Sequence, residues 1–221
     1  GAMLFYLLQR YPNIQHAVIN DINQDLVICY KTVRDSLGLL IESLKDIEKT
    51  YLSLQTEEKR KDFFMAARER YNEKGLDPIE NTTKFFFLNR TCFNGLYRVN
   101  KKGLFNVPFG KYANPTICDP NTLRKDSELL QRVEILTEDF EDTFDYANGN
   151  TFFYFDPPYR PLSDTSSFND YTKEAFNDDA QIRLKKYCDK INESGYKFML
   201  SNSDCKGKDE KDNFFDMLYE A

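Results

Sequence analysis

The sequence predicts an α/β fold in which short apolar strands alternate with amphipathic helices. Residues 17–19, 133–136 and 151–155 are apolar runs of strand length, and an acidic side chain follows each of them within two residues. Apolar residues at helical spacing fill much of the chain between these runs. Open α/β sheets bind ligands beyond the carboxyl ends of their strands, so we expect a site where these acids lie.

The strand predicted at residues 17–19 follows a helical stub at 4–8 and leads directly to Asp21. Asn23 or Asp25 can cap the helix that comes next. An acid at the end of such a strand commonly binds ribose hydroxyls. Since Asn23 can already cap the helix, we expect Asp21 to bind a ribose; helix capping is the alternative role.

Residues from about 31 to 81 read as charged amphipathic helices, which Gly75 and Pro78 interrupt. This pattern indicates an inserted helical layer. The segment 84–112 follows, and it reads as the start of a helix and then a hairpin-like stretch around residues 100–103.

The charge of the chain is unevenly distributed. The formal net charge is −6, yet no Asp or Glu occurs from residue 81 to residue 118. Six cations lie in that segment: Lys84, Arg90, Arg98, Lys101, Lys102 and Lys111. One basic segment on an acidic chain suits a single surface that faces a nucleic acid. The alternative is a solvated loop that lacks acids by chance.

The composition excludes several classes of protein. The five cysteines are an odd number without a Cys-x-x-Cys spacing, so neither a disulfide framework nor a zinc site is expected, and a reduced compartment is. No apolar run approaches the roughly 18 residues of a membrane span. His16 is the only histidine and has no supporting motif, which argues against hydrolases built on histidine or a metal.

The strand predicted at 133–136 leads to Asp139 and Phe140. Such a pair can hold an adenine, because a carboxylate accepts from its amino group and an aromatic ring covers its face. A helix over roughly 179–193 and a further strand at 198–202 follow.

The tetrapeptide Asp156-Pro157-Pro158-Tyr159 directly follows the strand predicted at 151–155. Each proline fixes its own φ, and Pro158 also restricts Pro157 to an extended geometry, so the loop is stiff. Asp156 and the Pro157 carbonyl can accept the two N–H groups of an exocyclic amine, and Tyr159 can stack on its ring. The alternative is a proline-rich turn with Tyr159 as ordinary packing.

Several motifs in one order resemble the Dam-type DNA adenine-N6 methyltransferases that act on GATC, with the motifs in the alpha order. The segments that carry the resemblance are 20–23, 88–90, 93–100, 105–112, 154–159, 161–171 and 200–203. The resemblance implies a Rossmann-like sheet dependent on S-adenosylmethionine, with a mainly helical DNA-recognition insertion. It implies a catalytic core at 1–30 and 130–221, and an insertion at 31–129 that carries the recognition hairpin.

The same resemblance implies roles for individual residues in catalysis and in binding the methyl donor. Asp156, Pro157 and Tyr159 would be catalytic, and no metal is expected. The donor, S-adenosylmethionine, would contact Gly1, Asp21, Asp139, Phe140 and Asp156. The family opens with Phe-x-Gly-x-Gly, and this chain matches only its tail, unless Gly1 and the next two residues are an expression scar. We therefore interpret the chain as a fragment that lacks most of that motif and the C-terminal strands, and its own capacity to bind the donor stays open.

The resemblance implies double-stranded DNA as the partner. The target adenine would have to leave the duplex to reach Asp156. Phe93 would fill the vacated stack, and Arg98 would read a guanine. Arg90 and Lys111 would contact phosphates. The other expected contacts are to neighbouring bases, from Asn94, Leu96 and Pro108, and from a flap at 163–171, through Ser163, Thr165 and Tyr171.

Two rival functions remain from the sequence. One is a catalytically silent, sequence-specific DNA-binding subunit, which the incomplete glycine motif favours. The other keeps the chemistry but acts on an RNA adenine or a protein amide. The resemblance also predicts a cytoplasmic, nucleoid-associated protein without a membrane anchor, and a cognate restriction endonuclease in the same system that need not bind it.

Overall fold

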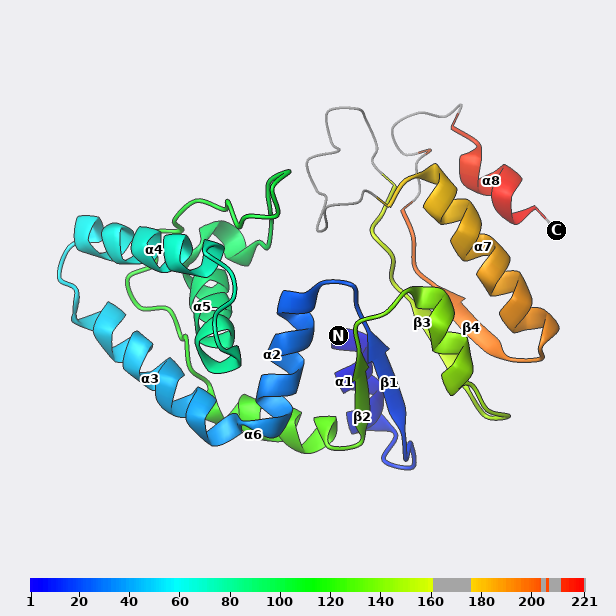
Figure 1. The fold of residues 1–221 in the computed structure, drawn as a ribbon, viewed down its shortest axis with the longest axis horizontal. Helices are drawn as coiled ribbons and strands as arrows, with labels where there is room; N and C mark the ends of the chain where they lie inside the picture. Colours follow the sequence, from blue (N-terminus) through cyan, green and yellow to red (C-terminus); the bar gives the residue numbers. More distant parts are fainter. Residues whose placement is uncertain (161–175, 204–205, 207–211, 221) are drawn as a thin grey trace. The chain divides into compact units, whose positions relative to one another are not determined.

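The computed structural model describes residues 1–160, 176–203, 206 and 212–220 of the chain (Figure 1). The chain divides into two compact units. Unit 1 comprises Gly1–Arg98 and Leu104–Phe140, and unit 2 comprises Val99–Gly103 and Glu141–Ala221. Each unit is described by itself below.

Unit 1 is mainly helical and contains one pair of parallel strands. Its elements in chain order are α1 (Ala2–Arg10), β1 (Ala17–Asn20), α2 (Gln24–Asp35), α3 (Leu37–Ser53), α4 (Glu57–Asn72), α5 (Pro78–Thr91), η1 (Phe93–Gly95), α6 (Pro120–Leu130) and β2 (Val133–Leu136). A 3-10 helix, η2 (Phe140–Tyr146), begins at Phe140, which is the last residue of unit 1. Strands β1 and β2 pair in parallel, from Ala17 opposite Val133 to Asn20 opposite Leu136.

Local signals in the sequence fix where three of these helices begin. The Asn23 side chain accepts from the first-turn N–H groups of α2, which confirms the predicted cap. Asp77 and Asp119 cap α5 and α6 in the same way, and each is followed by a proline at the first helical position. Proline suits that position because its fixed φ is helical and its missing N–H is not needed there.

An aromatic cluster holds α5 in the centre of unit 1. The Phe87 ring packs edge-on against Tyr51 of α3 and Phe63 of α4, with ring centroids 5.5 and 5.4 Å apart. Phe87 and Tyr51 are fully buried, and burial of one such side chain contributes about 1.5–3 kcal/mol. The Tyr51 hydroxyl also donates to the Tyr112 carbonyl at 2.6 Å. The core therefore fixes both α5 and the loop at Tyr112, which lies within the basic segment.

Unit 2 contains a strand–helix–strand arrangement. Its elements are β3 (Phe152–Phe155), α7 (Asp178–Glu193), β4 (Lys197–Leu200) and α8 (Phe214–Tyr219). Strands β3 and β4 pair in parallel, from Phe152 opposite Lys197 to Phe155 opposite Leu200. The Tyr187 ring of α7 packs edge-on against Phe155, with centroids 5.8 Å apart, so α7 covers one face of the pair.

The structure confirms the predicted α/β class and the predicted strands and helices, with small shifts at their ends. One expectation was wrong: residue 84 does not begin a helix but lies in the middle of α5, because the Asp77 cap and Pro78 start the helix earlier. The turn around residues 100–103 is present, where the Gly103 N–H donates to the Asn100 carbonyl at 2.8 Å. Division of the chain into a catalytic core and an insertion stays a prediction.

Within the described ranges, no helix is both long enough and apolar enough to cross a membrane.

Candidate active site and nucleic-acid interface

The predicted acids of unit 1 meet at the carboxyl edge of β1 and β2. The Asn20 side chain clamps the two strand exits, because its Nδ2 donates to the Glu138 carbonyl and its Oδ1 accepts from the Glu138 N–H, both at 2.9 Å. Asp21 and Asp139 directly follow the clamped residues. The structure therefore brings these two predicted ligands of the methyl donor to one edge.

Asp21 is held with one carboxylate oxygen available. Its Oδ1 accepts from the Asn23 N–H at 2.8 Å, and its Oδ2 has no hydrogen-bond partner among the described residues. Burial raises the pKa of the Asp21 carboxyl. A half-buried carboxylate with a free oxygen at a strand end fits a ribose hydroxyl. The cap of α2 comes from Asn23, so the alternative role of Asp21 as the cap is taken by another residue.

Gly1 packs closely against α2. A Cβ atom at this position would lie 2.0 Å from the Tyr30 hydroxyl oxygen, so a side chain cannot fit unless Tyr30 moves. Phe140 and Asp139 are half-buried at the start of η2.

In unit 2, Asp156, Pro157 and Tyr159 lie on one loop that leaves β3. The Asp156 carboxylate is exposed, and neither it nor the Pro157 carbonyl has a hydrogen-bond partner among the described residues. The Tyr159 ring is 53% exposed, while its hydroxyl pairs with the Ser201 hydroxyl at 2.9 Å. Ser201 itself donates its N–H to the Phe155 carbonyl at 2.9 Å. Two open acceptors and one held aromatic ring thus share a short, stiff loop.

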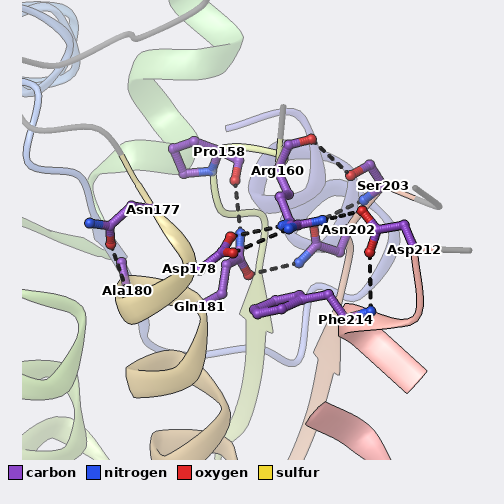
Figure 2. Close-up of polar contacts among 10 residues, drawn as sticks. All are labelled: Pro158, Arg160, Asn177, Asp178, Ala180, Gln181, Asn202, Ser203, Asp212 and Phe214. Atoms are coloured by element: carbon purple, nitrogen blue, oxygen red, sulfur yellow. Dashed lines mark hydrogen bonds and ion pairs between the residues drawn. The ribbon is translucent and has the colours of Figure 1, made fainter. Parts of the chain in front are cut away.

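The stem of this loop is fixed by Arg160 (Figure 2). The Arg160 guanidinium binds the Asp178 carboxylate through Nε and Nη2, at 2.8 and 3.1 Å, and also pairs with Asp212. Its Cζ lies 4.5 Å from the centre of the Phe214 ring. The Phe214 N–H, and then Arg160, lower the pKa of Asp212. These contacts tie the loop to the first turn of α7 and to the start of α8.

The predicted DNA-reading residues of unit 1 surround a tight turn after α5. Asn94 and Gly95 both have positive φ, 54° and 62°, which asparagine and glycine tolerate best. The Asn89 side chain donates to the Gly95 carbonyl at 2.7 Å and holds the turn. Phe93 and Leu96 are left 51% and 49% exposed. Two apolar side chains are therefore presented to solvent on a constrained backbone.

Residues 108–110 run alongside this turn and support it through backbone hydrogen bonds. The Phe93 N–H donates to the Pro108 carbonyl at 2.9 Å, and the Gly110 N–H donates to the Thr91 carbonyl at 2.8 Å. A Cβ on Gly110 would meet the Cys92 carbonyl oxygen at 2.5 Å, so the approach requires glycine. Pro108 is thereby placed beside Phe93.

Three of the predicted cationic contacts differ in how they are held. Arg98 donates from Nε to the Asn106 side chain at 2.8 Å, which orients its guanidinium. Arg90 is exposed and lines a hollow of about 390 Å³ together with residues 112–116. Lys111 pairs with Glu57 at 3.1 Å, and both side chains are mostly exposed.

Ser163, Thr165 and Tyr171 lie outside the described residues. No role was predicted from the sequence for five polar side chains that support these loops: Asn89, Asn106, Gln181, Ser201 and Asn202. Their partners lie 6 to 42 residues away along the chain, and nothing in a local pattern pairs them. Among the described residues, no group of three or more His, Cys, Asp or Glu side chains could hold a metal ion.

The fold and these two sites define a class of protein that comparison with known proteins identifies. The profile of the D12 class N6 adenine-specific DNA methyltransferases matches residues 1–221. The chain belongs to this family.

Curated relatives agree. The chain is 49% identical to the type II methyltransferase M.MjaIII of Methanocaldococcus jannaschii, over all of this chain and 74% of that protein. It is 38% identical to the type II methyltransferase M1.LlaDCHI of Lactococcus lactis subsp. cremoris, over 92% of this chain and 69% of the relative. It is 30% identical to the DNA adenine methylase of Escherichia coli K12, over 85% of this chain and 64% of the relative.

Proposed function

We propose that the protein transfers a methyl group from S-adenosylmethionine to the N6 atom of an adenine that is flipped out of duplex DNA. The observation that carries this proposal is the loop after β3. Asp156 and the Pro157 carbonyl offer acceptors that have no partner in the described part of the chain, beside the exposed ring of Tyr159, in a chain that belongs to an adenine-specific family.

The loop activates a poor nucleophile. The lone pair of the adenine N6 is delocalised into the ring, and two acceptors placed for its two N–H groups draw it toward a tetrahedral form. Tyr159 stacks on the base, a contact worth about 1–3 kcal/mol. S-adenosylmethionine, when bound, supplies an electrophilic methyl group on a sulfonium. In the transfer the sulfur–methyl bond of the donor would break as the N6–carbon bond forms, and Asp156 would accept the proton that N6 then releases.

Residues of unit 1 are suited to hold the donor. The free Oδ2 of Asp21 accepts from ribose hydroxyls, Asp139 accepts from the adenine amine of the donor, and Phe140 covers its face. Gly1 provides the close backbone approach that its packing on Tyr30 requires. The proposed fold is a Rossmann-like, S-adenosylmethionine-dependent methyltransferase fold, and Asp156 is proposed to contact the donor as well as the target base.

Residues 90–111, called the recognition segment below, are suited to read DNA. Phe93 enters the gap that the flipped base leaves, while Asn94, Leu96 and Pro108 contact neighbouring bases. Arg98, oriented by Asn106, reads a guanine. Arg90 and Lys111 contact phosphates, and Lys111 exchanges its exposed pair with Glu57 for the DNA backbone. Ser163, Thr165 and Tyr171 are proposed to follow the phosphate path.

The proposed target sequence is GATC, which rests on the resemblance of the recognition segment to GATC-type enzymes. Two relatives carry the name type II methyltransferase, which supports a role in restriction–modification beside a cognate endonuclease. The proposed location is the bacterial cytoplasm, on the nucleoid.

One assay tests this function. Full-length protein receives labelled S-adenosylmethionine and either a GATC duplex or a GTTC duplex that is otherwise identical. Transfer to the GATC duplex alone is expected. Transfer to both duplexes would reject the target sequence, and binding of GATC without any transfer would support the silent DNA-binding subunit instead.

A further inference from the structure

In the loop Asp156-Pro157-Pro158-Tyr159, the ψ angle of Pro158 is a backbone torsion between the two acceptors and the aromatic ring that no proline restricts. Asp156 and Pro157 each precede a proline, so both are restricted to extended geometry, and each proline fixes its own φ. The ψ angle of Pro158 has no such restraint, because a tyrosine follows it. This angle sets the direction of the Pro158 carbonyl and the position of Tyr159 relative to Asp156.

A buried side chain of α7 contacts the group that this torsion moves. Gln181 is 0% exposed, and its Nε2 donates to the Pro158 carbonyl at 3.3 Å (Figure 2). A buried amide without a partner is costly, and a rotated Pro158 carbonyl would leave Nε2 in that state. The bond therefore favours one value of the Pro158 ψ angle.

The orientation of Gln181 is itself determined by its neighbours. The Ser203 N–H donates to Asn202 Oδ1 at 2.9 Å, and Asn202 Nδ2 donates to Gln181 Oε1 at 3.0 Å. A backbone N–H can only donate and a carbonyl can only accept, so this chain of bonds has a single direction. It begins at Ser203, after β4, and ends at Pro158, after β3. Neither amide can flip without breaking two bonds.

We propose that Gln181 is a positioning residue for methyl transfer: it sets the angle between the Tyr159 ring, on which the base stacks, and the two acceptors, Asp156 and the Pro157 carbonyl. Ser201 holds the far end of the same ring through the tyrosine hydroxyl. The inference rests on the proposed function, and Gln181 touches neither substrate in it.

The first test replaces Gln181 by a side chain of similar length that cannot hydrogen-bond. In full-length protein, Gln181→Met is expected to lower kcat by about 100-fold, since a small misplacement of reacting groups has that effect. The dissociation constant for the duplex is expected to stay unchanged. The control is Gln131→Met, which likewise removes two hydrogen bonds of one side-chain amide, here to the carbonyls of Arg34 and Ser127 in unit 1.

The second test separates positioning from general support of the fold. In Gln181→Glu, burial raises the pKa of the new carboxyl. Its protonated form can donate to the Pro158 carbonyl and accept from Asn202, whereas its ionised form can only accept. The kcat of this variant, divided by that of the wild type, is expected to rise as pH falls, while the same ratio for Gln181→Met stays flat.

Several outcomes would overturn the inference and leave the proposed function intact. One is wild-type kcat in both variants while the wild-type protein methylates GATC. Another is a flat kcat ratio for Gln181→Glu, which also decides the matter if Gln181→Met does not fold. Absence of transfer by the wild-type protein itself would instead reject the proposed function.

Discussion

The side-chain amide of Asn89 donates to the carbonyl of Gly95 across 2.7 Å, and so joins the end of α5 to a turn with two consecutive positive φ angles. This turn presents Phe93 to solvent. The turn is therefore constrained before any DNA is bound. In the proposed function Phe93 on this turn acts as a wedge that enters the duplex, and a pre-formed wedge loses less conformational entropy on binding than a mobile one.

Asn89→Ala should loosen this wedge. We expect a loss of about 1 kcal/mol in the free energy of unfolding, as for one hydrogen bond. We also expect weaker base flipping, measured by the fluorescence of 2-aminopurine at the target position. The control is Gln15→Ala, which removes an exposed hydrogen bond from the Gln15 side-chain amide to the Asn13 carbonyl. Undiminished fluorescence in Asn89→Ala would show that Phe93 needs no such support.

Arg98→Ala should relax the preference for one guanine by about 1–3 kcal/mol. The reason is that Asn106 accepts from both Nε and Nη2 of the guanidinium and so fixes the direction in which Arg98 reaches the base. Competition binding with single-base variants of the duplex measures the preference. Arg90→Ala is the matched comparison, and it should weaken all duplexes alike and reduce the salt dependence. Equal loss on every sequence in Arg98→Ala would make that residue a phosphate contact too.

Asp156→Ala should abolish methyl transfer in the full-length protein and leave duplex affinity largely intact, because most of the proposed DNA contacts lie on other segments. Filter binding and incorporation of labelled methyl groups measure the two properties. Wild-type rates in this variant would reject the catalytic role of Asp156.

Gly110→Ala should destabilise the protein and impair DNA binding. The added Cβ would lie 2.5 Å from the Cys92 carbonyl oxygen, so the brace against the end of α5 must open. Gly38→Ala in α3 is the matched control. Nothing lies within 4 Å of its added Cβ, and this change should stabilise by up to about 1 kcal/mol. Thermal unfolding of both variants gives the comparison, and equal melting temperatures would contradict it.

Asp21→Asn should stabilise the protein at neutral pH while it weakens donor binding. Burial raises the pKa of the Asp21 carboxyl, so the folded state binds the proton more tightly than the unfolded state does. Stability therefore falls as pH rises from the ordinary Asp value toward the raised one. Asparagine does not ionise, and it can still accept from the Asn23 N–H. Denaturant unfolding at pH 7 and at pH 3 tests this, with a gain expected only at pH 7.

Local chemistry explains what the sequence could predict. Asn23 caps α2 from within three residues, so this helix start could be predicted. The Asp-Pro pairs in front of α5 and α6 are equally local signals, but Pro78 was interpreted as an interruption and the start of α6 was not predicted. The apolar strands and their acidic ends are equally local, and the register of β1 and β2 then places Asp21 near Asp139. These parts of the site follow from short-range patterns.

The supporting bonds could not be predicted, because they join residues that are far apart in sequence. Gln181 reads as an ordinary polar position on an amphipathic helix, yet it is fully buried and contacts Pro158, 23 residues earlier. Asn106 looks like a loop residue until the fold places it on Arg98. Such partners become visible only when tertiary packing is known.

Helix α5 packs into the interior through Phe87, and its C-terminal end leads into the turn that is proposed to face DNA. Phe87 is locked among aromatic rings, and only four residues later the helix ends at Thr91, just before the wedge. The hydrophobic interior, by fixing α5, therefore also fixes the position of the turn at Phe93–Gly95. A descendant of this protein that recognises another target would have to change the side chains that project beyond Thr91, since shifting the helix would sacrifice the fold itself.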